Sequence, residues 1–238
     1  MNIIDFFDRT QIINLASRAD RRRETETEFA QLGFPIHTEK VGFFAAICPT
    51  AAEGFVNAGV RGCYLSHLKI IEGAQASGVN NVLILEDDIS FAKHILRDGA
   101  AAVESLRGLD WDIAYFGHAL ESAPGEVAWK EVTEPMLLAH FYAINGKAIP
   151  ALARFLNQVL ERPPGHPDGG PMHYDGALNT FRKQNPQIKA YYCSKNLGYQ
   201  RPSKTNLHET SYFDKNPLFK PVMDLFRRLK RVYWKWVR

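Results

Sequence analysis

Residues 81–88 (NVLILEDD) constrain the fold of this chain more strongly than any other stretch. Residues 82–85 are an uncharged run of β-favouring side chains, which is typical of a strand buried on both faces. The run ends in three adjacent carboxylates, Glu86, Asp87 and Asp88, which repel one another unless a positive charge lies among them. At the carboxyl end of a parallel strand that charge is usually a divalent metal with its phosphate ligand. The alternative is a solvent-exposed acidic turn that caps the following helix.

Strand patterns alternate with helix patterns along most of the sequence. Strands are expected at residues 10–15, 35–41, 82–86, 111–117, 126–132, 136–144 and 189–194, and helices at residues 17–32, 62–77, 92–106, 147–161 and 173–185. The segments 43–61 and 196–209 are expected to be irregular, and the Pro/Gly-rich residues 162–172 are long enough to form a functional lid. The alternation predicts an α/β domain with a mostly parallel, Rossmann-like central sheet flanked by helices.

The first expected helix begins with an unusual cluster of arginines. Ser17 is its expected cap, with Asp20 three residues later, as in a capping box. Four cations crowd a helix N-terminus, where the dipole disfavours positive charge: Arg18, Arg21, Arg22 and Arg23. They either form an exposed basic face with Glu24, Glu26 and Glu28 as partners, or place one or two guanidinium groups where a phosphate binds.

Composition limits the compartment in which the chain is expected to work. Its 238 residues suffice for one compact core. The three cysteines show neither the paired spacing of a disulfide framework nor a zinc signature, which favours a reducing compartment. Asp5, Asp8 and Arg9 interrupt the first ten residues, so no signal peptide is expected, and no run of about 18 apolar residues is present to span a membrane. We therefore expect a cytoplasmic protein.

The charge of the chain is unevenly distributed. Residues 217–238 contain seven basic residues and one acid, Asp224, so this segment carries +6 and the rest of the chain carries −3 within the total of +3. Apolar side chains recur at helical spacing between residues 221 and 236, and Trp234 and Trp236 lie near the end. A basic amphipathic helix of this kind suits an anionic membrane surface. The alternative is a helix docked on the body or in an oligomer; nucleic acid is not expected, because the body offers no basic groove.

Several separated motifs together resemble glycosyltransferase family 25, whose bacterial members are associated with lipopolysaccharide biosynthesis. In order they are IINLASRADRR, GCYLSHLKI, LILEDD, HFYAIN, a late Asp and a polar segment beginning GYQ. The resemblance covers residues 10–208. It implies a GT-A-like domain at residues 1–210 and leaves residues 211–238 as a separate basic tail.

The resemblance also implies an activity. Members of this kind transfer a hexose, most often galactose, from a UDP-sugar donor with inversion at the anomeric carbon. The acceptor would be lipopolysaccharide or another glycan, often linked to a lipid. This implies a donor site that needs a divalent cation, Mn²⁺ or Mg²⁺, and a protein bound peripherally to the inner face of the cytoplasmic membrane.

The metal-binding DxD motif of such enzymes corresponds here to residues 86–88. Asp88 is the first candidate for a metal ligand, and Glu86 would meet the ribose or the metal shell. Asp87 is expected to point away from the metal and to belong to the nucleotide-binding residues, because the side chains of neighbouring residues in an extended segment point in opposite directions. The family pattern also suggests His208 as a further metal ligand.

Other family positions are assigned by the same resemblance. Asn14 and Arg18 would lie beside the nucleotide, and Arg22 would reach a phosphate. Ser66 and His67 match the GCYLSHLKI motif as donor-site residues. A lone buried histidine is, however, more often a hydrogen-bonded structural residue.

An inverting transfer requires a general base for the acceptor hydroxyl. The late Asp of the family pattern corresponds to Asp175, which we expect to act as the base or to bind the acceptor. The competing interpretation is that Asp175 only caps the helix that follows.

Two further function classes compete with a glycosyltransferase. A metal-dependent phosphoesterase would also place acids at a strand end, but two-metal sites draw ligands from several strands, and few such acids follow the other strands here. A relative that binds a nucleotide-sugar or a partner without turnover is the other alternative.

Overall fold

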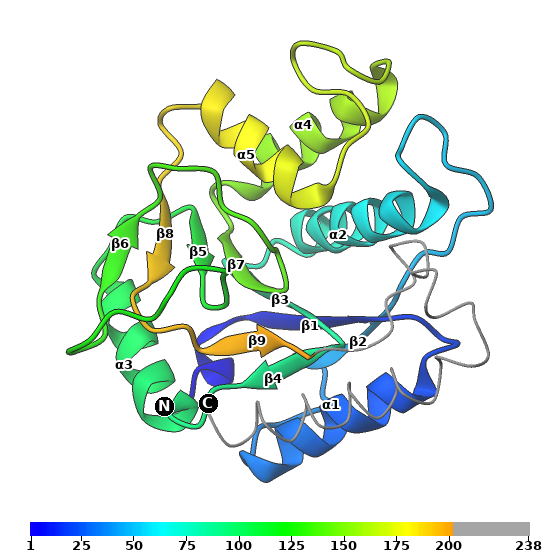
Figure 1. The fold of residues 1–238 in the computed structure, drawn as a ribbon. Helices are drawn as coiled ribbons and strands as arrows, with labels where there is room; N and C mark the ends of the chain where they lie inside the picture. The colour runs from blue at the N-terminus through cyan, green and yellow to red at the C-terminus, as the bar shows by residue number, and fades with distance from the viewer. Residues whose placement is uncertain (202–238) are drawn as a thin grey trace, which may run out of the picture.

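The computed structural model describes residues 1–201, which form one α/β body (Figure 1). Its helices are η1 (Ile4–Phe6), α1 (Ala19–Gln31), α2 (Ala58–Ala76), α3 (Ile95–Arg107), α4 (Ile149–Glu161) and α5 (Tyr174–Gln184). Its strands are β1 (Arg9–Asn14), β2 (Val41–Ala45), β3 (Asn81–Glu86), β4 (Ile89–Phe91), β5 (Ile113–Tyr115), β6 (Trp129–Glu131), β7 (Phe141–Asn145), β8 (Ala190–Cys193) and β9 (Gly198–Gln200). The predicted C-terminal helix and the 211–238 tail lie outside the described residues.

The central sheet has seven strands in the order β2-β1-β3-β7-β5-β8-β6. β2, β1, β3, β5 and β8 run in one direction, and β7 and β6 run against them, so the sheet is mostly parallel in strand direction. A separate antiparallel pair joins β4 to β9. The prediction of a mostly parallel sheet flanked by helices is therefore confirmed.

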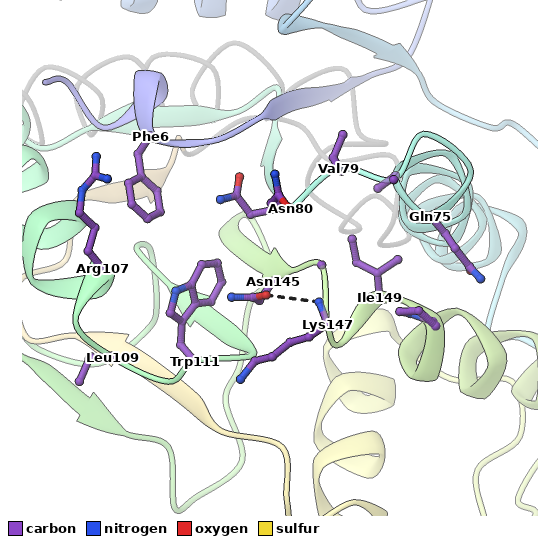
Figure 2. Close-up of a pocket in the computed structure, with 15 residues that line it drawn as sticks. Phe6, Gln75, Val79, Asn80, Arg107, Leu109, Trp111, Asn145, Lys147 and Ile149 are labelled. Atoms are coloured by element: carbon purple, nitrogen blue, oxygen red, sulfur yellow. Dashed lines mark hydrogen bonds between the residues drawn. The ribbon is translucent and has the colours of Figure 1, made fainter.

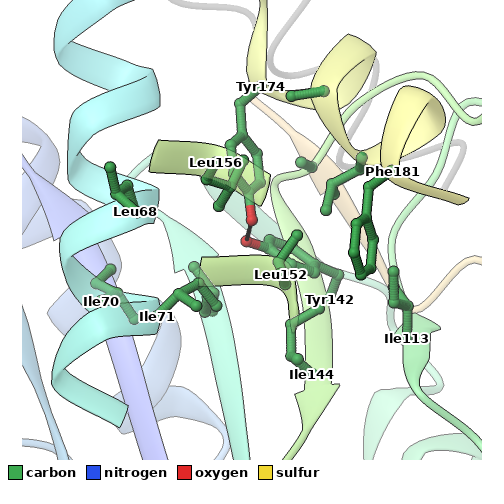
Figure 3. Packing of buried hydrophobic residues seen from close by; sticks show 14 of the residues in the cluster. Leu68, Ile70, Ile71, Ile113, Tyr142, Ile144, Leu152, Leu156, Tyr174 and Phe181 are labelled. Carbon is green, nitrogen blue, oxygen red and sulfur yellow. Dashed lines mark hydrogen bonds between the residues drawn. The ribbon is translucent and has the colours of Figure 1, made fainter. Parts of the chain in front are cut away.

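Strand β3 alternates its side chains between two hydrophobic cores. Val82 and Ile84 join the core that also contains residues of α2, α4 and α5 (Figure 3). Leu83 and Leu85 join the core on the other face, with residues of α1 and α3. All four side chains are fully buried, as expected of a strand covered on both sides. Figure 1 shows the same layering, with α2, α4 and α5 on one face and α1 on the other.

The predicted strand at residues 35–41 is wrong. The second strand begins at Val41, where the predicted strand ends, and runs to Ala45, into the segment expected to be irregular; it pairs in parallel with β1 from Thr10↔Val41 to Asn14↔Ala45. Residues 37–40 form bends instead, where Thr38 Oγ1 accepts a hydrogen bond from the Val41 backbone N–H at 2.9 Å. The register of β2 is set by its pairing with β1, and the local sequence pattern does not encode that pairing.

Helix boundaries also differ from the expected ones. The cap of α1 is Arg18 rather than Ser17, and its side chain makes no capping hydrogen bond. Helix α2 begins four residues earlier than expected, because Asn57 Oδ1 accepts a hydrogen bond from the Val60 backbone N–H at 2.9 Å. The short strand β9 lies in the polar segment expected to be irregular. It pairs with β4, which begins directly after the acidic residues 86–88.

No helix among residues 1–201 is long and apolar enough to cross a membrane.

A substitution at Gly117, two residues after the end of β5, tests how closely this part of the protein is packed. A Cβ atom at this position would lie 2.5 Å from His140 Nε2 and 2.7 Å from the Gly198 carbonyl oxygen. We expect Gly117→Ala to lower the free energy of unfolding by about 1–3 kcal/mol, as overpacking does. Gly42→Ala in β2 is the matched control, since no heavy atom lies within 4 Å of its added Cβ. Equal urea midpoints for the two variants would contradict this packing.

Candidate functional site

Several of the predicted site residues, among them Asn14, His67 and the acidic residues 86–88, meet at the edge of the sheet where the parallel strands β1, β2 and β3 end. Ile13 of β1 pairs with Glu86 of β3, so Asn14 and the acidic residues 86–88 leave the sheet side by side. Helix α1 follows β1 at this edge, and His67 of α2 lies 3.7 Å from Glu86. This is the edge at which open α/β sheets bind ligands.

Asp87 is held by both of its carboxylate oxygens. Asn14 Nδ2 donates to Oδ2 at 2.7 Å, and Arg21 Nη1 donates to Oδ1 at 2.8 Å. Its backbone carbonyl accepts from Thr25 Oγ1 at 2.8 Å and from Arg201 Nη2 at 2.6 Å. The Asp87 side chain is buried, so this network joins β1, α1 and β3 in a region of low dielectric.

Glu86 and Asp88 are less completely satisfied. Glu86 Oε2 accepts from Gln200 Nε2 at 2.9 Å, while Asp88 Oδ2 lies 3.4 Å from Arg21 Nη1. Asp88 Oδ1 is buried and has no hydrogen-bond partner among residues 1–201. Asp88 Oδ1, which lacks a hydrogen-bond partner and lies near the carboxylate of Glu86, is suited to bind a hard divalent cation, because such cations prefer oxygen ligands.

The electrostatics of the pair agree with that fit. Burial raises the pKa of Glu86 and that of Asp88 above the ordinary carboxyl range. For Asp88 the next cause of the raised pKa is the negative charge of Glu86. Arg21 opposes both pKa shifts with its positive charge. A bound cation would stabilise the ionised form of both groups in the same way.

The arginine of the α1 cluster that contacts Asp87 and Asp88 is not one of the two assigned to the nucleotide, Arg18 and Arg22. Arg18 ion-pairs with Asp20 at 2.8 Å, and Arg22 ion-pairs with Glu26 at 3.2 Å. Arg21 instead contacts both Asp87 and Asp88. Arg21 precedes the buried Thr25 by four residues, so helical spacing was the signal that could have identified it.

Arg201 is a residue that sequence reasoning missed. Its backbone N–H donates to the Asp88 carbonyl at 2.6 Å, and its Nη1 donates to the Ile89 carbonyl at 2.6 Å. Nε also lies 3.3 Å from Glu24 Oε2. Arg201 therefore binds the backbone of the acidic turn, a contact that only the β4–β9 pairing creates.

The two residues of the GCYLSHLKI motif have different environments. Ser66 Oγ accepts from the Ile47 N–H at 2.9 Å and donates to the Gly62 carbonyl at 2.7 Å, so it ties the segment after β2 to α2. His67 is fully buried and stacks on Tyr174 with ring centroids 4.0 Å apart. Burial lowers the pKa of His67 to about 3, so the ring is neutral.

Asp175 lies in the first turn of α5. Oδ2 accepts from the Leu138 backbone N–H at 3.2 Å, and Oδ1 accepts from the Gly176 N–H at 2.8 Å. Leu138 has a positive φ of 72°, so Asp175 supports an unusual loop conformation. The negative charge of Asp175 also contributes to the raised pKa of Glu86, which relates α5 electrostatically to the acidic residues. The predicted ligand His208 lies outside the described residues.

A hollow of about 760 Å³ lies at the opposite edge of the sheet, away from the acidic residues. Its lining includes Asn81 at the start of β3 and Asn145 at the end of β7, together with Trp111, Arg107 and Lys147 (Figure 2). None of the predicted site residues lines it. The candidate site is therefore defined by the chemistry at the carboxyl edge and not by this hollow.

Comparison with known proteins identifies related sequences. Residues 51–121 match the family model described as glycosyltransferase family 25 (LPS biosynthesis protein). A glycosyltransferase 25 family member of Aedes aegypti is 28% identical over 152 residues, covering 55% of this chain and 24% of the relative. The inactive glycosyltransferase 25 family member 3 of Mus musculus is 28% identical over 144 residues, covering 58% and 23%. The matches thus span about a quarter of the length of these curated relatives.

A solved structure of a glycosyltransferase involved in the glycosylation of the major capsid of PBCV-1 aligns with a TM-score of 0.37 at 13% identity. That alignment covers 82% of this chain and 96% of the other. The segment matched by the family model contains Ser66, His67 and the three acidic residues 86–88. The family-model match and the named relatives support the assignment of this chain to glycosyltransferase family 25.

Proposed function

We propose that this protein is a metal-dependent glycosyltransferase that moves a hexose from a UDP-sugar to a glycan acceptor with inversion. The observation that carries the proposal is the buried Asp88 Oδ1, which has no hydrogen-bond partner within residues 1–201 and follows Glu86 at the carboxyl end of β3. Galactose is the first choice of sugar and lipopolysaccharide the first choice of acceptor, both on the family resemblance.

The charges at the site favour a donor that arrives with a cation. Arg21 contacts Asp87 and Asp88, and its positive charge also acts on Glu86. Arg201 binds the backbone of the same turn and pairs with Glu24. The acids therefore exceed the guanidinium groups available to them among the described residues. Mn²⁺ or Mg²⁺, held by Asp88 and Glu86, would neutralise the charge that develops on the departing nucleoside diphosphate.

The chain's own residues hold that arrangement in place. Asn14 and Arg21 use both oxygens of Asp87, so the turn cannot rotate to present a different carboxylate. The Gln200 amide fixes one oxygen of Glu86. In this proposal Asp87 is therefore a positioning residue, and Asp88 is the principal ligand of the cation.

Asp175 is the group we propose as general base toward the acceptor hydroxyl. It lies on α5 next to the Pro/Gly-rich residues 162–172, and its charge acts on Glu86. Both carboxylate oxygens accept backbone N–H bonds, and a carboxylate oxygen has a second lone pair with which to accept a proton. Residues 162–172 are the proposed determinant of acceptor choice.

The donor proposal is tested by thermal unfolding with UDP-, CMP- and GDP-sugars, each with and without Mn²⁺. A ligand at 100 times its Kd stabilises by about 2.7 kcal/mol, so we expect a clear, metal-dependent rise in Tm with a UDP-hexose. Asp88→Asn should abolish the rise. Asp110→Asn is the control, because Asp110 is exposed and pairs with Lys147 and Lys189, away from the site. A rise that persists in Asp88→Asn would contradict the assignment.

The role of Asp175 is tested by Asp175→Asn, which keeps an oxygen to accept the Leu138 N–H bond. If Asp175 is the base, kcat for sugar transfer should fall about 10²- to 10⁴-fold while the donor-induced Tm rise is unchanged. Asp110→Asn, an exposed acid away from both the acidic residues and the 162–172 loop, should behave as wild type. An unaltered kcat in Asp175→Asn would leave this residue with only its role in supporting the loop.

We also propose that the basic segment 217–238 binds an anionic membrane surface, where lipid-linked acceptors would be met. Each basic residue near such a surface contributes about 1 kcal/mol. Deletion from Pro217 onward should therefore abolish sedimentation with anionic liposomes at moderate salt, and neither protein should bind neutral vesicles. Equal binding by the full-length and truncated chains would overturn this assignment.

One alternative is supported by a specific observation, since a relative bears the name of an inactive family member. In that case the chain would bind a nucleotide-sugar or a partner without turnover. Donor-dependent stabilisation without sugar transfer to any glycan acceptor distinguishes this alternative from the enzyme. The phosphoesterase alternative predicts instead the hydrolysis of a generic phosphodiester.

A further inference from the structure

Cys63, His67 and Glu86 form a cluster of mixed ligand chemistry beside the acidic turn. Cys63 and His67 are four residues apart on α2, so they lie on the same face of the helix, and Glu86 meets them from the end of β3. One ligand atom from each residue lies within 4.8 Å of the other two. The cluster therefore joins a thiol, an imidazole and a carboxylate from two separate elements.

Hydrogen bonds orient the His67 ring. Tyr142 Oη lies 2.9 Å from Tyr174 Oη (Figure 3) and 2.9 Å from His67 Nδ1. In the tautomer that carries its proton on Nδ1, this proton is donated to Tyr142 Oη and Nε2 keeps a free lone pair. Tyr174 stacks parallel to the imidazole at 4.0 Å with an interplanar angle of 7°, which fixes the ring plane. The arrangement matches that of metal-bound histidines, whose second nitrogen donates to an orienting group.

His67 Nε2 faces the carboxylate of Glu86. Nε2 is buried, has no hydrogen-bond partner in the described part of the chain, and lies 3.7 Å from Glu86 Oε1. That distance is too long for a hydrogen bond. It is close to the separation of about 3.5 Å between two ligands of a tetrahedral ion with bonds of about 2.0–2.3 Å. The other separations in the cluster are at most 4.8 Å.

The ligand types select a class of cation. Thiolate and imidazole favour zinc-class ions, whereas Mg²⁺ and Mn²⁺ prefer oxygen ligands. Three protein ligands leave one position of a tetrahedral ion open. The cluster thus differs in chemistry from the oxygen site proposed at Asp88, although Glu86 belongs to both.

We propose that Cys63, His67 and Glu86 bind a thiophilic divalent cation of the zinc class. Binding forms a bond from Cys63 Sγ to the ion and releases the thiol proton to solvent, while His67 contributes the Nε2 lone pair and Glu86 contributes a carboxylate oxygen. The site does not depend on sugar transfer.

Co²⁺, the spectroscopic substitute for Zn²⁺, tests the site in the full-length protein. We expect a near-ultraviolet thiolate-to-Co²⁺ charge-transfer band with one equivalent of ion, displaced by Zn²⁺. Cys63→Ser should abolish the band, and His67→Gln should weaken Co²⁺ binding at least tenfold. Cys48→Ser is the matched control, because Cys48 is exposed and lies outside the cluster. Circular dichroism verifies that each variant is folded.

The wild-type protein supplies an independent measurement if Cys63→Ser does not fold. Zn²⁺ should slow the alkylation of Cys63, mapped by mass spectrometry, at least tenfold without slowing that of Cys48. The proposal is overturned if the wild type shows no charge-transfer band, if Cys48→Ser abolishes the band instead, or if Zn²⁺ leaves the alkylation of Cys63 unchanged.

Discussion

The structure of the acidic edge depends on the buried carboxylate of Asp87. Its two oxygens bind Asn14 at the end of β1 and Arg21 on α1, so one side chain joins two adjacent strands to the helix between β1 and β2. Removing one partner of a buried pair of this kind leaves an uncompensated charge and costs about 3–5 kcal/mol. Asp87, although it is the middle acid of the motif, therefore serves the framework, while Asp88 keeps one oxygen without a hydrogen-bond partner among residues 1–201.

Two oppositely packed faces of the sheet hold this edge in position. Alternate residues of β3 enter the two cores, so the strand cannot shift by one residue without moving every apolar side chain to the other face. The short pair β4–β9 then brings Gln200 and Arg201 to the same turn. Distant parts of the chain thus fix the side chains of residues 86–88 from both sides.

The edge contains two kinds of potential ligand. Asp88 offers an oxygen in an environment of other oxygens, whereas His67 offers a nitrogen lone pair that faces Glu86 with a thiol nearby. Tyr142 and Tyr174 hold the His67 ring in place from the core side. A histidine that is buried and fixed in this way can still offer its second ring nitrogen to a ligand. Glu86 lies between the two environments and couples them.

The sequence by itself determined the α/β class, the strand at residues 82–86 and the acidic turn, because apolar runs, helical spacing and adjacent carboxylates are local patterns. It did not determine the position of β2, the choice of Arg21 over Arg18 and Arg22, or the contribution of Arg201. Each of these depends on which segments pair across the sheet, and the sequence pattern does not encode such pairing. The cysteine spacing likewise showed no metal signature, because Cys63 meets Glu86 only when α2 packs against β3. Tertiary structure alone decided these points, since long-range pairing fixes which polar side chains share a buried edge.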